Sequence, residues 1–152
     1  MILYNKYKII TMNTEKLLKA LDNETNENII HLTTKKIQEM NLKILKELNL
    51  SKKETLELYK KLNGYKYVDE MDELKYGTYL RWVSISNPEN IELSKGAIFC
   101  EIKITDNGVN LVCKNHGFPP RHFQIKMDEN LLFQKLTDQE LVLLSALDHL
   151  SK

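Results

Sequence analysis

The sequence predicts an α+β protein. Helical periodicity and helix-capping patterns occupy the first 64 residues and the C-terminal end of the chain. Between them lie short runs rich in β-branched and aromatic residues, separated by turn-forming pairs. We expect an N-terminal helical subdomain (1–64, with 1–11 a candidate extension) and a second domain (65–152). The second is expected to be a small antiparallel barrel or strongly bent sheet, SH3-like or OB-like, with a C-terminal helix capping one open end.

Three helices are expected before residue 64. The first has Asn13 or Thr14 as its cap and carries leucines along one face. The polar run NETNEN breaks the pattern, and a second helix follows in TTKKIQEMNLKILKELNL. The third, ETLELYKKLNG, starts at a capping box formed by Ser51 and Glu54 and stops at Gly64.

Four strands and a closing helix are expected after residue 64. Asp106-Asn107-Gly108 reads as the turn of a hairpin, and Thr137-x-x-Glu140 is a capping box that opens the last helix. The strands are placed near Thr78–Ile85, Ala97–Ile104, Val109–Lys114 and His122–Met127.

Two segments share the phrase Glu-Leu-x-x-Gly. They are ELKYGTYLRW and ELSKGAIFCE, and in each the glycine stands just before a predicted strand. Gly77 and Gly96 are therefore expected where the chain bends sharply or takes positive φ before it enters a sheet, with the preceding leucines in the core. We interpret the phrase as a structural pattern that precedes a strand, and not as a binding signature or a repeat unit.

Composition limits the classes of function. The 152 residues carry a net charge of +1, so the whole molecule is not strongly attracted to nucleic acid or anionic membrane. No run approaches the ~20 apolar residues of a membrane span. The N-terminus MILYNKYKII lacks a signal-type apolar region, and with two cysteines this favours an intracellular protein with reduced thiols, in cytoplasm or nucleus.

One set of residues has zinc-ligand chemistry: Cys100, Cys113, His116 and His122. A two-residue turn at Asn107-Gly108 would pair Ile102 with Cys113, and a four-residue loop would pair Cys100 with Cys113. Either register places both cysteines on the apolar face of the hairpin, where thiols behave as small hydrophobes. We therefore expect core thiols, with no metal and no other cofactor.

No pattern indicates catalysis. Phosphate-binding glycine loops and nucleophile motifs are absent from the sequence, and the acids from Asp69 to Glu73 are expected to be solvated. We predict a non-catalytic adaptor or structural module that binds another protein, and leave its oligomeric state open. The candidate surfaces are the predicted helical hairpin before Gly64, a strand edge at Arg81 and Trp82, and the loop His116–His122, which includes Arg121.

The alternative is a nucleic-acid-associated factor. The predicted helical pair before Gly64 carries lysines able to meet phosphates, and the tyrosines beside Arg81 could form a stacking surface on the sheet. The lysines concerned are Lys52, Lys53, Lys60 and Lys61.

Several segments resemble small proteins of large nucleocytoplasmic DNA viruses. They are GYKYVDEMDELKYGTYLRWV, ELSKGAIFCEI and FQKLTDQELVLLSALD, and the Lys, Asn and Ile content is similar as well. The resemblance covers the chain from about Gly64 onward. It implies an intracellular viral protein, packaged in the virion in one interpretation, and it assigns no active-site residue.

Overall fold

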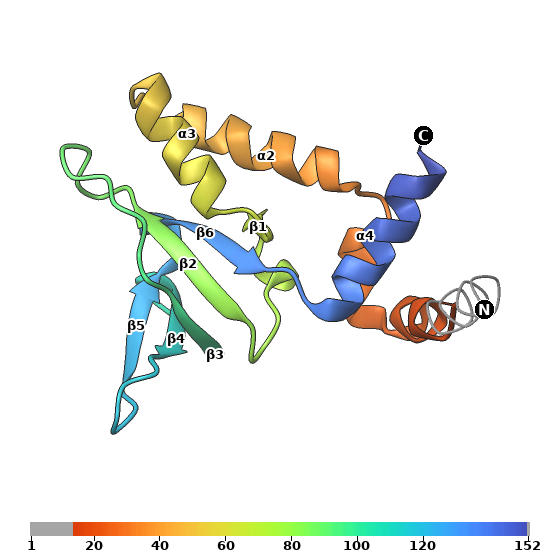
Figure 1. Cartoon of the computed structure of the whole chain (residues 1–152). Coiled ribbons are helices and arrows are strands. Elements are labelled where there is room, and N and C mark those ends of the chain that lie inside the picture. Colours follow the sequence, from red (N-terminus) through yellow and green to blue (C-terminus); the bar gives the residue numbers. More distant parts are fainter. Residues whose placement is uncertain (1–13, 152) are drawn as a thin grey trace. The chain divides into compact units, whose positions relative to one another are not determined.

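The computed structural model describes residues 14–151 (Figure 1). Its contacts divide the chain into two units: a sheet unit, Gln38–Lys135, and a helical unit, whose described residues are 14–37 and 136–151. Residues 14–22 form a helix. The later elements are η1 (Glu24–Ile29), α2 (Thr34–Lys46), α3 (Lys52–Lys61), β1 (Tyr65–Val68), η2 (Met71–Glu73), β2 (Tyr79–Ser84), β3 (Ala97–Thr105), β4 (Gly108–Lys114), β5 (His122–Lys126), η3 (Met127–Glu129), β6 (Asn130–Lys135) and α4 (Asp138–Leu150), where η denotes a 3₁₀ helix.

The capping patterns mark the helix starts. The Ser51 hydroxyl accepts a hydrogen bond from the Glu54 N–H at 3.1 Å, which confirms the start of α3. At α4 the box is complete: the Thr137 hydroxyl accepts a hydrogen bond from the Glu140 N–H at 3.1 Å, and the Glu140 carboxylate accepts one from the Thr137 N–H at 2.9 Å. Gly64 follows α3 with φ +84°. The alternative cap at Asn13 lies outside the described residues, as does the predicted extension 1–11.

The helical unit has its own small core. Leu143 and Leu144 of α4 are 2% exposed and pack with Ala20, Ile29 and Ile37. The Asp148 carboxylate accepts hydrogen bonds from the N–H and the hydroxyl of Thr34, at 2.8 and 2.6 Å. The prediction that the C-terminal helix caps an open end of the sheet is therefore wrong. Its apolar side is covered by the N-terminal helices instead.

The sheet unit contains six antiparallel strands in the order β1-β6-β2-β3-β4-β5. All four predicted strands are confirmed, whereas β1 and β6 were missed. Because β1 and β5 are not paired with each other, the sheet has two edges and is not closed; the prediction of a barrel is wrong.

The sheet is nevertheless strongly bent. Trp82 on β2 and Phe123 on β5 have ring centroids 5.9 Å apart, although β3 and β4 lie between their strands. Three strand spacings in a flat sheet would separate them by about 14 Å. The bend encloses one apolar cluster, and Leu80, Phe99 and Leu111 are fully buried in it.

The other face of β1, β6 and β2 is covered by the α2–α3 hairpin (Figure 1). Leu45 of α2 and Leu62 of α3 are almost fully buried against Val83 and Phe133. Residues of the predicted helical subdomain therefore share a core with the sheet. A boundary between independently folding parts at residue 64 stays a prediction.

Both glycines of the repeated phrase take positive φ, +82° at Gly77 and +95° at Gly96, which confirms the backbone conformation predicted for them. At Gly96 the need is also steric, because an added Cβ would lie 2.5 Å from the carbonyl oxygen of Leu80. The two phrases lie side by side, since Leu80 pairs with Ala97.

One edge of the sheet is closed by hydrogen bonds. On β1 the outward N–H of Tyr65 bonds the Leu62 carbonyl at 3.0 Å. The Asn41 side chain donates to the Tyr65 carbonyl and accepts from the Tyr67 N–H, both at 2.9 Å. The Tyr67 carbonyl accepts a hydrogen bond from the Lys66 ammonium at 3.2 Å. The carboxamide of Asn41, 3% exposed, thus replaces a neighbouring strand.

Replacing Asn41 by alanine should lower the free energy of unfolding by about 2 kcal/mol, because two backbone groups of β1 lose their partners. Urea unfolding measures this. Asn90→Ala, at an exposed loop position, is the control and should change stability by less than about 0.5 kcal/mol. Equal stability of the two variants would contradict the capping role.

Candidate functional site

The opposite edge of the sheet is β5, and its backbone direction follows from the hairpin. The Asn115 N–H donates to the Arg121 carbonyl at 3.1 Å, so Arg121 faces β4. Successive backbone groups of a strand point to alternate sides. The N–H and C=O groups of His122, Gln124 and Lys126 therefore point away from β4, toward the edge.

This edge is largely open. The Lys126 carbonyl accepts a hydrogen bond from the Asn130 side chain at 2.7 Å. Within residues 14–151, the outward N–H and C=O of His122 and Gln124 have no hydrogen-bonding partner. These four backbone groups and the outward N–H of Lys126 are thus available to an added strand, in contrast to the closed edge at β1.

A braced loop leads into this edge. The Asn115 side-chain oxygen accepts hydrogen bonds from the N–H groups of Gly117 and Arg121, at 3.2 and 3.1 Å. Pro119 and Pro120 restrict the backbone further. At the tip, the Phe118 side chain is fully exposed. Such a loop presents a large apolar ring in a fixed place, which is how binding anchors are commonly held.

The residues predicted in the loop His116–His122 lie at the surface. His116, Arg121 and His122 are exposed, as a binding role requires. Phe118 was not among the predicted binding residues, although an aromatic residue beside two prolines was the available signal. The open edge at β5 has no signal in the sequence, because the order of the strands in the sheet decides which strand lies at an edge.

Polar residues cover the face of β3–β5 that lies opposite the apolar cluster. Cross-strand partners share a face, so Lys114 lies beside His122. His116 stacks on Tyr79 of β2, with ring centroids 5.7 Å apart. The charged residues of β3–β5 on this face are Glu101, Lys103, Lys114 and Lys126. Lys126 pairs with Glu129 at 3.7 Å, and Lys103 and Lys114 outnumber Glu101, which leaves the face basic.

Arg81 and Trp82 are engaged in the fold. β2 lies between β6 and β3, so the prediction that they form a strand edge is wrong. The Arg81 guanidinium donates to the carbonyls of Ser94, at 2.9 Å, and Lys61, at 3.5 Å. It thereby joins β2 to the C-terminal end of α3. Trp82 is half-buried beside Phe123.

All four candidate lysines of α3 are exposed: Lys52, Lys53, Lys60 and Lys61. Lys60 and Lys61 stand in the last turn, where the helix dipole favours cations. Lys52 and Lys53 stand in the first turn, where the helix dipole disfavours cations. Lys52 also lines a groove between α2 and α3.

The zinc set does not come together. β3 and β4 pair Ile102 with Leu111 up to a bulge, after which Cys113 faces Phe99. Cys113 is fully buried in the apolar cluster, as predicted. Cys100 falls within the bulge and is only half-buried, so its place on the apolar face stays a prediction. Among residues 14–151 no group of three or more His, Cys, Asp or Glu side chains is placed to hold a metal ion.

One acid of the Asp69–Glu73 run has a structural role. The Glu73 carboxylate accepts hydrogen bonds from the N–H groups of Asp69 and Glu70, at 2.8 and 2.9 Å, and pairs with Lys66 at 3.0 Å. Burial raises the pKa of Glu73, but these bonds outweigh it, and the net effect is a lowered pKa. An ionised Glu73 thus fixes the turn after β1.

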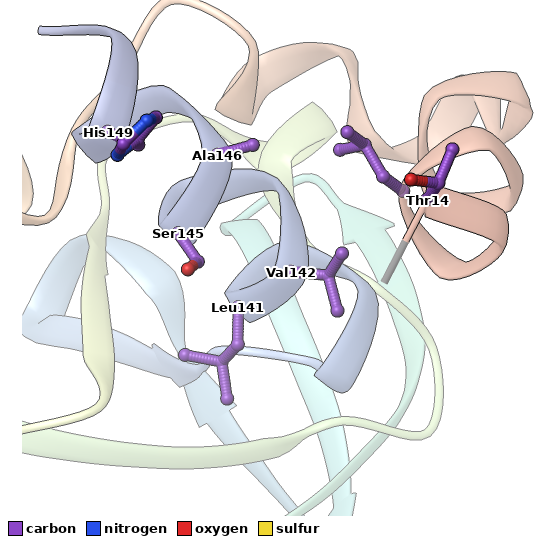
Figure 2. A pocket seen from close by; sticks show the side chains of 7 residues that line it. Thr14, Leu141, Val142, Ser145, Ala146 and His149 are labelled. Atoms are coloured by element: carbon purple, nitrogen blue, oxygen red, sulfur yellow. The ribbon is translucent and has the colours of Figure 1, made fainter. Parts of the chain in front are cut away.

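The helical unit contains a groove of about 550 Å³ (Figure 2). Leu141, Val142, Ser145, Ala146 and His149 of α4 line it, with Thr14 and Leu17 of the first helix opposite. The lining is mainly apolar, with His149 and Ser145 as polar groups. It suits a nonpolar side chain better than a charged group.

Comparisons with protein-family models, with curated proteins and with solved structures find no match. No helix within residues 14–151 is both long and apolar enough to cross a membrane.

The buried thiol gives a pH-dependent prediction. Burial, with a smaller contribution from Cys100, raises the pKa of Cys113 from 9.0 to about 11. Below pH 9 the thiol is protonated in both the folded and the unfolded state. Between pH 9 and about 11 only the unfolded state ionises, so stability is lost as pH rises.

Urea unfolding of the wild type and of Cys113→Ala across this range tests the effect. The stability advantage of the wild type should shrink by about 1 kcal/mol per pH unit. An advantage that stays constant up to pH 11 would contradict a buried, protonated thiol.

Proposed function

We propose that the protein is a non-catalytic adaptor that binds an extended segment of another protein by strand addition along β5, with Phe118 as an apolar anchor. The observation that carries this proposal is the difference between the two sheet edges. The outward groups of Tyr65 and Tyr67 on β1 are hydrogen-bonded, and those of His122 and Gln124 on β5 are not. Native proteins usually protect exposed edges, because such edges recruit other chains.

Strand addition uses main-chain hydrogen bonds for affinity and side-chain contacts for specificity. Each bond made to His122 or Gln124 contributes a net of about 0.5–1.5 kcal/mol. Phe118 precedes β5 by only a few residues, so a segment that runs along the strand and past Arg121 approaches the loop. Burial of an aromatic ring at such a point adds about 2 kcal/mol or more.

We also propose that the sheet has an SH3-like arrangement. β2–β5 form a meander, and β6 returns to lie beside β2 after the short helix η3. This path supports an opened, SH3-like arrangement. A viral origin, an intracellular location and packaging in a virion stay predictions that rest on the sequence resemblance.

Proline at position 124 tests strand addition. It removes the outward N–H of Gln124 and breaks no bond to β4, and edge strands tolerate proline at such positions. Peptides are first selected on the wild type from a random displayed library, and their affinities are then measured by fluorescence polarisation. Gln124→Pro should weaken binding about tenfold or more, whereas Gln124→Ala should bind as the wild type does.

Phe118→Ala tests the anchor in the same assay and should also weaken binding about tenfold or more. Ile104→Ala is its control, because Ile104 is 72% exposed at the far end of the β3–β4 hairpin. Peptides that bind Gln124→Pro as tightly as the wild type would contradict strand addition. If the wild type is a dimer and Gln124→Pro is a monomer, the β5 edge pairs with a second copy of this chain instead.

Nucleic-acid binding is a second candidate, favoured by the basic face of β3–β5. Lys103, Lys114 and Lys126 share this face with the stacked rings of Tyr79 and His116. A single strand could meet the lysines with its phosphates and the rings with its bases.

Binding to mixed-sequence single-stranded DNA and RNA, followed by fluorescence anisotropy, tests this candidate. Three phosphate contacts predict a slope of about −2 in log affinity against log salt. Alanine at all three lysines of the face should abolish binding, whereas alanine at Lys43, Lys53 and Lys60 should not. Equal loss in the two triple variants would indicate nonspecific attraction and contradict a site on this face.

A further inference from the structure

The α2–α3 hairpin carries a groove on the side away from its core. Leu45 and Leu58 point toward the sheet, which leaves Leu42 and Leu56 on the flanks of the two helices. Leu56 is 48% exposed. The groove measures about 430 Å³ and is lined by Leu42, Lys46, Leu50, Lys52, Thr55 and Leu56.

The charge of the groove is of one sign. Its ionisable lining groups are Lys46 on α2 and Lys52 on α3, both exposed. Lys60 lies one helical turn beyond Leu56 and adds to the positive potential. The acid on this flank of α2 is Glu39, about one turn before Leu42.

The position of Lys52 is unfavourable for the helix itself. The first turn of a helix carries a positive partial charge, so a lysine there is repelled. The same potential attracts a carboxylate placed at the groove. The apolar floor and the basic rim therefore complement one kind of occupant.

We propose that this groove binds an acidic segment of a partner protein that carries a bulky apolar side chain. The apolar side chain enters between Leu42 and Leu56, and flanking carboxylates meet Lys46 and Lys52. A neutral apolar ligand would leave both lysines unused, and a nucleic acid would leave the leucines unused. The surface is separate from the β5 edge and does not rest on strand addition there.

Three short peptides serve as probes: an acidic amphipathic peptide with leucines on one face, the same peptide with its acids changed to lysine, and the acidic peptide with its leucines changed to serine. They are titrated into the isotope-labelled full-length protein and followed by NMR. Only the first should bind, and its shift changes should centre on Leu42, Lys46, Lys52 and Leu56.

Charge reversal supplies the decisive variants. Lys46→Glu with Lys52→Glu should weaken the acidic peptide about tenfold and strengthen the lysine peptide. Lys43→Glu with Lys53→Glu makes the same charge change on the same helices outside the groove and should have little effect.

Equal weakening by the two double variants, or binding of the serine peptide, would overturn the proposal, as would shift changes elsewhere. Gln124→Pro should leave acidic-peptide binding unchanged, so failure here and failure of the β5 proposal are distinguishable.

Discussion

The binding surface proposed for this protein follows from how the backbone groups at the two edges of its open sheet are hydrogen-bonded. A closed barrel has no edges, but this sheet ends at β1 and β5. At β1 the Asn41 carboxamide takes the place of a neighbouring strand, and it can do so because α2 lies along that edge. No element is packed in the same way against β5 within residues 14–151, where only the Lys126 carbonyl is covered. The fold therefore closes one edge and leaves the other for a partner.

The bend of the sheet explains why so many predicted binding residues have structural roles. Trp82 meets Phe123 inside the bend, and Arg81 joins β2 to the end of α3. Glu73, in the acidic run, holds the turn after β1. Residues free to meet a partner lie at the periphery, on the loop before β5 and on the outer flanks of α2 and α3. The two proposed surfaces differ in chemistry: one offers backbone groups and an aromatic ring, the other an apolar groove with a basic rim.

Local signals predicted much of this fold, and long-range pairing accounts for what they missed. The sequence predicted the helix starts at Ser51 and Thr137 because a capping pattern is formed by only a few consecutive residues. β6 was missed because both of its faces are covered: Leu132, Phe133 and Gln134 are all buried, so the alternation typical of a strand is lost. The role of Asn41 has no local signal, and only the placement of β1 beside it shows that role. The bulge at Cys100 likewise has no local signature.

Backbone amide hydrogen exchange of the free protein distinguishes an open β5 edge from a covered one. The Tyr65 and Tyr67 amides are bonded to the Leu62 carbonyl and the Asn41 side chain, and they should be protected. The His122 and Gln124 amides should exchange at nearly the rate of an unfolded chain, while that of Phe123, which faces β4, is protected. Protection of His122 and Gln124 equal to that of Tyr67 would show that β5 is already covered, and would contradict the account.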